Sequence, residues 1–257
     1  MANFRQTRFP AIPVVIKYLI IINFAVWLME LMWHGSWFID FFALHDFRSP
    51  LFKPHQVVTH LFLHDPASIW HILFNMFALW MFGSTLENYW GPKRFLNFYL
   101  ICGIGAGVIY LLALYFFLDT KAVLALAEFQ AHPSQELLNE ILSKFNLNGS
   151  FGGTPDDVYF QLKNSLFNEP VLGASGAIFG VLVAFGYTFP NTEMFIIPIP
   201  FPIKAKYLVG GYVLLELFTG FQDRPGDNVA HFAHLGGALV GFLMVVFWNR
   251  TNKRDFY

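Results

Sequence analysis

Six long apolar runs constrain the fold of this chain more than any other feature of its sequence. The hydrocarbon core of a bilayer is about 30 Å thick, so a helix needs roughly 20 largely apolar residues to cross it. Lipid leaves no water to satisfy backbone groups, and the runs are too continuous for the short alternating strands of a barrel. We therefore expect an all-α membrane protein with six transmembrane helices. The predicted spans are residues 14–32, 69–86, 95–118, 171–189, 205–221 and 230–248.

The composition agrees with lipid as the surrounding solvent. The 257 residues are 56% hydrophobic and only 13% charged, whereas soluble domains carry roughly 25% charged residues. A formal net charge of −1 argues against a nucleic-acid partner. The single cysteine, Cys102, excludes an intrachain disulfide. We expect one membrane domain over residues 1–257, with the bilayer as its main partner.

The distribution of lysine and arginine predicts the orientation of the chain. Cytoplasmic loops of membrane proteins are enriched in these residues. The richer side holds ten of them, mostly on short segments: Arg5, Arg8, Lys17, Lys93, Arg94, Lys204, Lys206, Arg250, Lys253 and Arg254. The other side holds six, mostly on long loops: Arg48, Lys53, Lys121, Lys144, Lys163 and Arg224. We expect both termini to be cytoplasmic, in a prokaryotic cytoplasmic membrane.

Two segments are predicted not to cross the membrane. Residues 34–65 are aromatic and interrupted by Pro50 and Pro54, which indicates a first loop lying in the membrane interface. Residues 119–170 form a polar insertion loop, with a short helix expected at 134–145 and a glycine-rich break at 148–155. A loop of this length is usually functional or disordered.

The fourth run opens with a small-residue motif that contains a serine. Gly173, Ser175 and Gly176 form a Gly-x-Ser-Gly sequence, and Gly180 follows one turn later. Gly176 and Gly180 form a ridge that lets another helix approach closely. On its own the motif is more typical of a helix contact than of a nucleophile, since small residues are common at such contacts.

The sixth run supplies a matching ridge and a histidine. His234 lies in its first turns, and Gly237 and Gly241 follow on one face. Packing the two ridges together brings Ser175 beside His234. A serine needs a base within hydrogen-bond reach to become a good nucleophile, and an ionisable residue inside a span indicates function.

The second run adds two polar side chains on one helix face. His71 and Asn75 are four residues apart, so they point the same way. Two donors directed at one point suit a developing oxyanion. A hydrogen bond between helices explains the pair equally well.

These three motifs, in this order and on these spans, look like those of rhomboid proteases over roughly residues 55–250. The resemblance implies that Ser175 attacks a peptide carbonyl of a transmembrane substrate and that His234 accepts and then returns its proton. It implies that His71, Asn75 and the Ser175 backbone N–H bind the oxyanion, with Gly173 in the same substrate-binding group. It also implies a two-residue dyad, so no third member is named.

Three residues, Tyr89, His55 and Gln56, depart from the family pattern. Glu87 matches a glutamate that the family keeps at the inner end of this span, but Tyr89 stands where an arginine is often found. His55 and Gln56 replace a Trp-Arg pair of the first loop. This replacement leaves open how the loop is anchored.

No acid is obviously placed to orient His234. Glu216 on the fifth span and Asp227 before the sixth are nearest in sequence, and Glu216 is better interpreted as an interhelical hydrogen-bonding residue. No metal or other cofactor is expected, because zinc catalysis needs His-Glu-x-x-His or an equivalent carboxylate set. We interpret His60, His64 and His231 as polar groups around a wet outer cavity.

The sequence thus predicts an intramembrane serine endopeptidase. The alternative is a catalytically inactive rhomboid-like protein that binds or chaperones membrane proteins, which is expected to lack the serine or the histidine. A channel or transporter predicts charges along the span midplanes or paired broken helices, and neither feature is seen.

Overall fold

A computed structural model describes residues 12–33, 36–145, 147, 149–167, 170–195, 201–220 and 228–251. The chain folds into helices and one two-stranded hairpin. In order these elements are α1 (Val14–Met32), α2 (Ser36–Phe42), α3 (Gln56–Thr59), η1 (His60–Phe62), α4 (Ile69–Ala78), η2 (Leu79–Gly83), α5 (Ser84–Trp90), α6 (Pro92–Ala113), η3 (Leu114–Leu118), α7 (Asp119–Ala131), α8 (Gln135–Lys144), α9 (Pro155–Phe167), α10 (Ser175–Thr188), β1 (Glu193–Met194), β2 (Ile203–Lys204), α11 (Ala205–Gly220) and α12 (Asn228–Thr251).

Four helices in the described ranges are long and apolar enough to cross a membrane. They are Val14–Met32, Ile69–Trp90, Pro92–Phe116 and His231–Arg250. The second joins α4 and α5 through a π-helical turn, η2. The fourth and fifth predicted runs form shorter helices, α10 with 14 residues and α11 with 16. The protein is therefore a multi-pass helical membrane protein.

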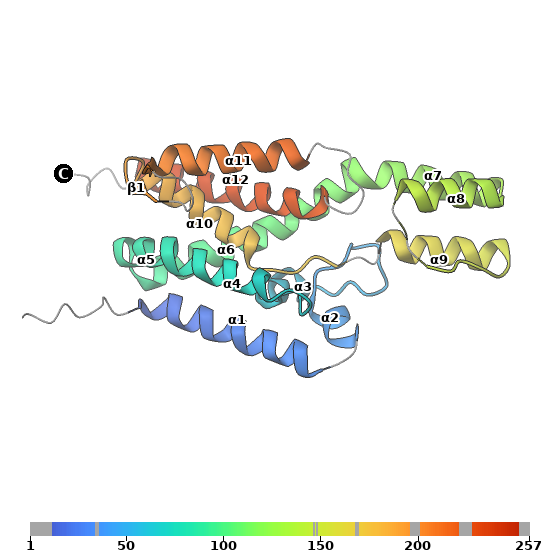
Figure 1. Cartoon of the computed structure of the whole chain (residues 1–257), viewed down its shortest axis with the longest axis horizontal. Helices are drawn as coiled ribbons and strands as arrows, with labels where there is room; N and C mark the ends of the chain where they lie inside the picture. The colour runs from blue at the N-terminus through green and yellow to red at the C-terminus, as the bar shows by residue number, and fades with distance from the viewer. Residues whose placement is uncertain are drawn as a thin grey trace, which may run out of the picture.

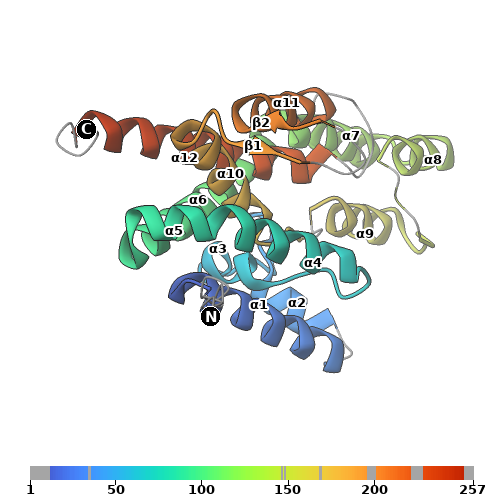
Figure 2. The same ribbon diagram turned by 60° about the vertical axis from the view of Figure 1, so that its left-hand side comes forward.

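The helices lie side by side in one bundle, with α1 at one edge and α11 at the opposite edge (Figure 1). The start of α1, the turn between α5 and α6, and the β1–β2 hairpin lie at one end of the bundle. Helices α7, α8 and α9 extend from the other end (Figures 1 and 2). Of the described basic segments, the start of α6 and β2 therefore lie at the end opposite the insertion helices α8 and α9.

Glu87 ties α5 to the beginning of α1. Its carboxylate accepts hydrogen bonds from the backbone N–H groups of Val15 and Ile16, both at 2.9 Å. The first N–H groups of a helix have no partner within the helix, and the helix dipole favours a negative charge there. Glu87 is only 3% exposed, so the cap is made inside the protein. Glu87 can therefore join α5 to α1 without an arginine at position 89, where Tyr89 stands.

Gln56 anchors the first loop in place of a Trp-Arg pair. The side chain is fully buried and makes five hydrogen bonds to backbone groups within residues 40–53, at N···O distances of 2.9 to 3.3 Å. The ring of His55 adds a bond to the carbonyl of Phe41 at 2.7 Å. One amide thus satisfies the backbone of a loop that has little regular structure.

The interpretation of His60 and His64 as groups around a wet cavity is wrong. They are 3% and 0% exposed, because the loop packs them against neighbouring helices. His60 lies against Gly107 of α6, and His64 lies beside the ring of His71 with the centroids 5.2 Å apart. Burial lowers the pKa of His60 to about 4 and that of His64 to about 3, since the charged form loses its water.

The insertion at 119–170 is a small helical unit rather than a loop. Its helix at 134–145 forms as α8, capped where Ser134 accepts from the N–H of Leu137. Two further helices were not expected. Helix α7 continues α6 through the π-helical η3, and α9 begins with a reciprocal cap between Thr154 and Asp157. The helices form because Leu126, Leu138, Leu162 and their apolar neighbours bury one another in a core of their own.

Candidate active site

A cavity of about 540 Å³ lies between α4, α10, α11 and α12. Four polar side chains line it: His71 and Asn75 from α4, Ser175 from α10, and His234 from α12. The rest of its wall is apolar or aromatic and includes Trp70, Phe74, Phe77, Phe82, Phe179 and Tyr212. A few convergent polar groups on an apolar wall are typical of a ligand-binding or catalytic site.

Ser175 is the first residue of α10, and backbone hydrogen bonds hold the chain just before it against the first loop. Leu44 and Val171 pair through two backbone hydrogen bonds of 2.9 and 2.8 Å, and the N–H of Gly173 donates to the carbonyl of His60 at 2.9 Å. These bonds fix the segment to the first loop. The backbone N–H of Ser175 lies in the first turn of α10, where it has no partner within the helix.

Gly173 leaves room for the polar groups of the cavity. Its φ of +131° is one that residues with a side chain rarely adopt. A Cβ there would lie 3.2 Å from Nε2 of His71 and 3.5 Å from Oγ of Ser175. A larger residue would therefore strain the backbone and fill the space between the two side chains.

The two glycine ridges of α10 and α12 are in backbone contact. A Cβ on Gly237 would collide with the carbonyl of Gly176, and one on Gly241 would lie 2.7 Å from Cα of Gly180. Helix α6 closes the other side, because a Cβ on Gly180 would lie 2.6 Å from Sγ of Cys102. Close approach of these backbones sets the positions of Ser175 and His234, which both face the cavity. Among the described residues, no hydrogen bond joins the two side chains directly.

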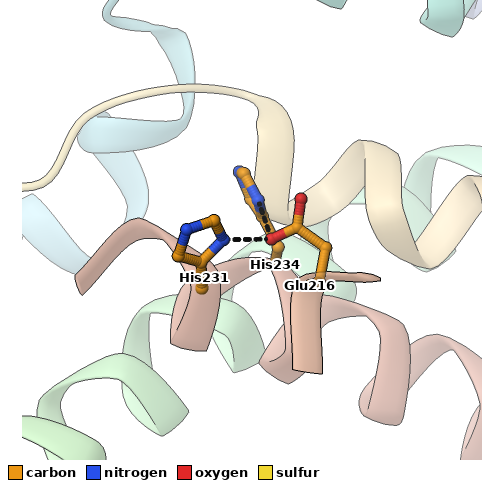
Figure 3. Close-up of side chains that lie close together, drawn as sticks. All are labelled: Glu216, His231 and His234. Atoms are coloured by element: carbon orange, nitrogen blue, oxygen red, sulfur yellow. Dashed lines mark hydrogen bonds and ion pairs between the residues drawn. The ribbon is translucent and has the colours of Figure 1, made fainter. Parts of the chain in front are cut away.

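The ring of His234 is held on its face and on one edge. It stacks on Phe179, one turn after Ser175, with centroids 4.3 Å apart and planes inclined by 10°. Its Nδ1 lies 3.1 Å from Oε2 of Glu216 on α11. Figure 3 shows the second ring nitrogen directed away from that carboxylate. An ionised carboxylate can only accept, so Nδ1 carries the proton and Nε2 has a free lone pair.

His71 has the opposite tautomer. Its Nδ1 accepts a hydrogen bond from the backbone N–H of Asp65 at 3.2 Å, so its proton lies on Nε2. That nitrogen is the one beside Gly173. The amide of Asn75, only 8% exposed, lines the same cavity. The site therefore combines donors on α4 with an unprotonated ring nitrogen on α12.

Sequence reasoning did not bring Glu216 together with His231 and His234. Oε2 of this buried carboxylate lies 2.6 Å from Nδ1 of His231 as well as 3.1 Å from Nδ1 of His234 (Figure 3). His231 does not line the cavity. The charge of Glu216 within an apolar helix was the available signal, but the sequence could not tell which face of α12 it meets.

Two imidazoles and one carboxylate are also a zinc ligand set. The ligand atoms of Glu216, His231 and His234 lie within 4.8 Å of one another. Ligands bonded at about 2.0–2.1 Å in a tetrahedral site lie roughly 3.3 Å apart. The 2.6 Å contact between His231 and Glu216 is shorter than that and is a hydrogen-bond distance.

Comparison with known proteins identifies the family. The family model described as Rhomboid domain matches residues 52–118 and 146–250. Its unmatched gap, residues 119–145, contains α7 and α8. The chain is 26% identical over 247 residues to "RHOMBOID-like protein 12, mitochondrial" of Arabidopsis thaliana, covering 94% of this chain and 60% of that protein.

Two further relatives are similar at the same level. "Rhomboid protein 1, mitochondrial" of Saccharomyces cerevisiae is 26% identical, over 73% of this chain and 40% of its own length. "Rhomboid-like protein 16, chloroplastic" of Arabidopsis thaliana is 25% identical, over 94% of this chain and 63% of its own length. The chain thus spans less than two thirds of the length of each of these relatives. The family match covers more than half of the chain and confirms the resemblance of its motifs: this protein belongs to the rhomboid family.

Proposed function

We propose that the protein is an intramembrane serine endopeptidase that cleaves transmembrane proteins with Ser175 as nucleophile and His234 as base. One observation carries the proposal: in the same cavity, Nδ1 of His71 faces a backbone N–H and Nδ1 of His234 faces a carboxylate, which assigns opposite protonation to their Nε2 atoms. The cavity therefore offers a hydrogen-bond donor where an oxyanion needs one and a free lone pair where a base needs one.

In the proposed reaction, Oγ of Ser175 attacks the scissile carbonyl carbon while its proton moves to Nε2 of His234. Negative charge develops on the carbonyl oxygen, and His71, Asn75 and the Ser175 N–H stabilise it. His234 then protonates the leaving nitrogen as the C–N bond breaks, which leaves an acyl-enzyme. A water molecule attacks this ester with His234 again as base, releasing the acid and restoring Ser175.

The proposed substrates are proteins with an apolar segment in the membrane. The aromatic wall of the cavity, to which α4 contributes most, suits an apolar peptide. We propose six membrane spans, made by the four long helices together with α10 and α11. At about 1.5 Å per residue, α10 is roughly 21 Å long, shorter than the bilayer core. Ser175 at its outer end would then lie below the membrane surface.

The membrane in which the protein resides stays a prediction. The sequence suggests a prokaryotic cytoplasmic membrane with both termini in the cytoplasm. The names of the three relatives instead refer to mitochondria and chloroplasts. These names describe the relatives alone.

An inactive rhomboid-like binding protein is the competing function, and a labelling experiment separates the two. Detergent-solubilised protein is treated with a fluorophosphonate probe, and the labelled residue is mapped by mass spectrometry. We expect label on Ser175, and none in Ser175→Ala or His234→Ala. Each variant should also abolish cleavage of a transmembrane reporter, and the double variant should be no worse, since the two residues act as a unit. Normal turnover by Ser175→Ala would exclude the proposed function.

A further inference from the structure

Glu216 is an acid inside an apolar helix, beside the proposed active site. Its side chain is 8% exposed and lies on α11, one turn after Tyr212 of the cavity wall. A charged residue within a membrane helix is costly, and it persists where it has a partner and a role. Two imidazoles of α12 supply the partner for Glu216.

A purely structural role requires only one of those two contacts. The bond to His231 is the shorter, at 2.6 Å, and by itself joins α11 to α12. The same oxygen also reaches Nδ1 of His234, the atom whose proton decides which nitrogen of the base is free. An interhelical hydrogen bond alone does not account for this second contact.

The plane of the His234 ring is fixed independently of Glu216. Phe179 stacks on the imidazole and thereby restricts its plane, but an aromatic face cannot choose a tautomer. The carboxylate supplies what the stack lacks, because it selects the form with the proton on Nδ1. Together Phe179 and Glu216 set both the orientation and the protonation of the ring.

We propose that Glu216 is a positioning residue for His234, so that the proposed dyad works as a Ser175–His234–Glu216 triad; this rests on the proposed function. During attack the Ser175 proton passes to Nε2, and the imidazole then holds protons on both nitrogens. Glu216 stays ionised and stabilises that positive charge, and the Nε2 proton leaves with the amine. His231 holds the carboxylate from the other side and carries no proton in the reaction.

The test compares Glu216→Gln, Glu216→Ala, Glu216→Asp and His231→Gln in the full-length protein in detergent. Glu216→Gln keeps the size of the side chain and removes its charge. We expect it and Glu216→Ala to lower kcat by up to about 10⁴-fold with KM nearly unchanged. Glu216→Asp should recover part of kcat. His231→Gln, which breaks the shorter bond, should lose much less. Equal kcat losses in Glu216→Gln and His231→Gln would overturn the proposal in favour of a structural tie.

A second measurement does not depend on activity. In protein labelled with ¹⁵N-histidine, the His234 signals are assigned by their absence in His234→Ala. The wild type should show the Nδ1–H tautomer for His234, and Glu216→Ala should lose that preference. An unchanged tautomer would overturn the role of Glu216. If Ser175→Ala abolishes cleavage while Glu216→Gln keeps full kcat, the protease stands and the triad falls. If Ser175→Ala is fully active, the protease falls, and the tautomer alone decides whether Glu216 positions His234.

Discussion

The first carbon of any side chain at Gly237 on α12 would fall on the backbone carbonyl of Gly176 on α10. Residue 237 lies one turn after His234, and residue 176 directly follows Ser175. The contact therefore sets the separation of the two proposed catalytic side chains through the backbone alone. The contact requires glycine at residue 237, although residue 237 does not line the cavity.

Gly237→Val should strongly impair cleavage without touching either catalytic side chain. The valine would push α12 from α10, and a misplacement of about 1 Å can cost roughly 10²-fold in rate. The measurement is single-turnover cleavage per folded molecule. Gly210→Val is the matched control, because a Cβ at Gly210 on α11 meets nothing within 4 Å. Leu239→Val, on an exposed face of α12, should also be mild. Full activity in Gly237→Val would disprove the packing argument.

Asn75→Ala should lower kcat by about 10- to 10³-fold while KM changes little. The amide lines the cavity beside His71, and loss of one oxyanion donor acts on the transition state alone. Kinetics and thermal unfolding are measured together. Leu73→Ala, on the same helix and outside the cavity lining, serves as control. A lower unfolding temperature with normal turnover per folded molecule would make Asn75 a structural residue instead.

The periodicity of the sequence predicted part of this site for a physical reason. His71 and Asn75 lie in α4 before the π-helical turn of η2, where spacing of four residues still places side chains on one face. The first predicted span coincides with α1 because its run is long and mostly apolar, with only Lys17, Asn23 and Glu30 as strongly polar residues. The predicted run that contains the serine motif begins at residue 171, but α10 begins at Ser175, since backbone hydrogen bonds tie Val171 and Gly173 to the first loop.

Other features depended on contacts that no periodicity encodes. Which face of α11 meets α12 is decided by packing, so the pairing of Glu216 with two histidines was missed. Helices α7 and α9 form because they bury each other's apolar sides, and α7 also continues α6 across a π-helical turn. The sequence left open how the first loop is anchored, because it does not show which five backbone groups surround the Gln56 side chain.

Folding stability should fall as the pH is lowered from about 6.5 to about 4. Burial lowers the pKa of His60 to about 4 and that of His64 to about 3, so the folded protein does not bind protons that the unfolded chain binds below 6.5. The contribution of these two histidines to stability is therefore fully present above the pKa of an unfolded histidine, about 6.5. Thermal unfolding midpoints are measured across this range.

His64→Gln removes one of these two titrations and should flatten the dependence on pH. The groups facing His64 are the ring of His71 and the carboxylate of Glu30, which accepts from the His64 N–H. They remain in the variant, so any change in slope belongs to residue 64. An unchanged slope in His64→Gln would show that its burial does not control stability in acid.

Membrane orientation is testable with single cysteines in a Cys102→Ala background. Ser150, between α8 and α9, and Asn191, between α10 and β1, are both exposed. The insertion helices and β1 lie at opposite ends of the bundle (Figure 1). The lysine and arginine bias predicts that Ser150→Cys reacts only from the non-cytoplasmic side and Asn191→Cys only from the cytoplasmic side. Reaction of both cysteines from one side would contradict six spans.

The pairing of Leu44 with Val171 has a consequence for biosynthesis. The segment before Ser175 is held by a loop made much earlier in the chain, and His234 is supplied by the last helix. A chain emerging from the ribosome therefore has neither an anchored serine nor a base until nearly all of it has been synthesised. Unfinished or truncated copies would therefore lack the proposed dyad and could not cleave neighbouring membrane proteins.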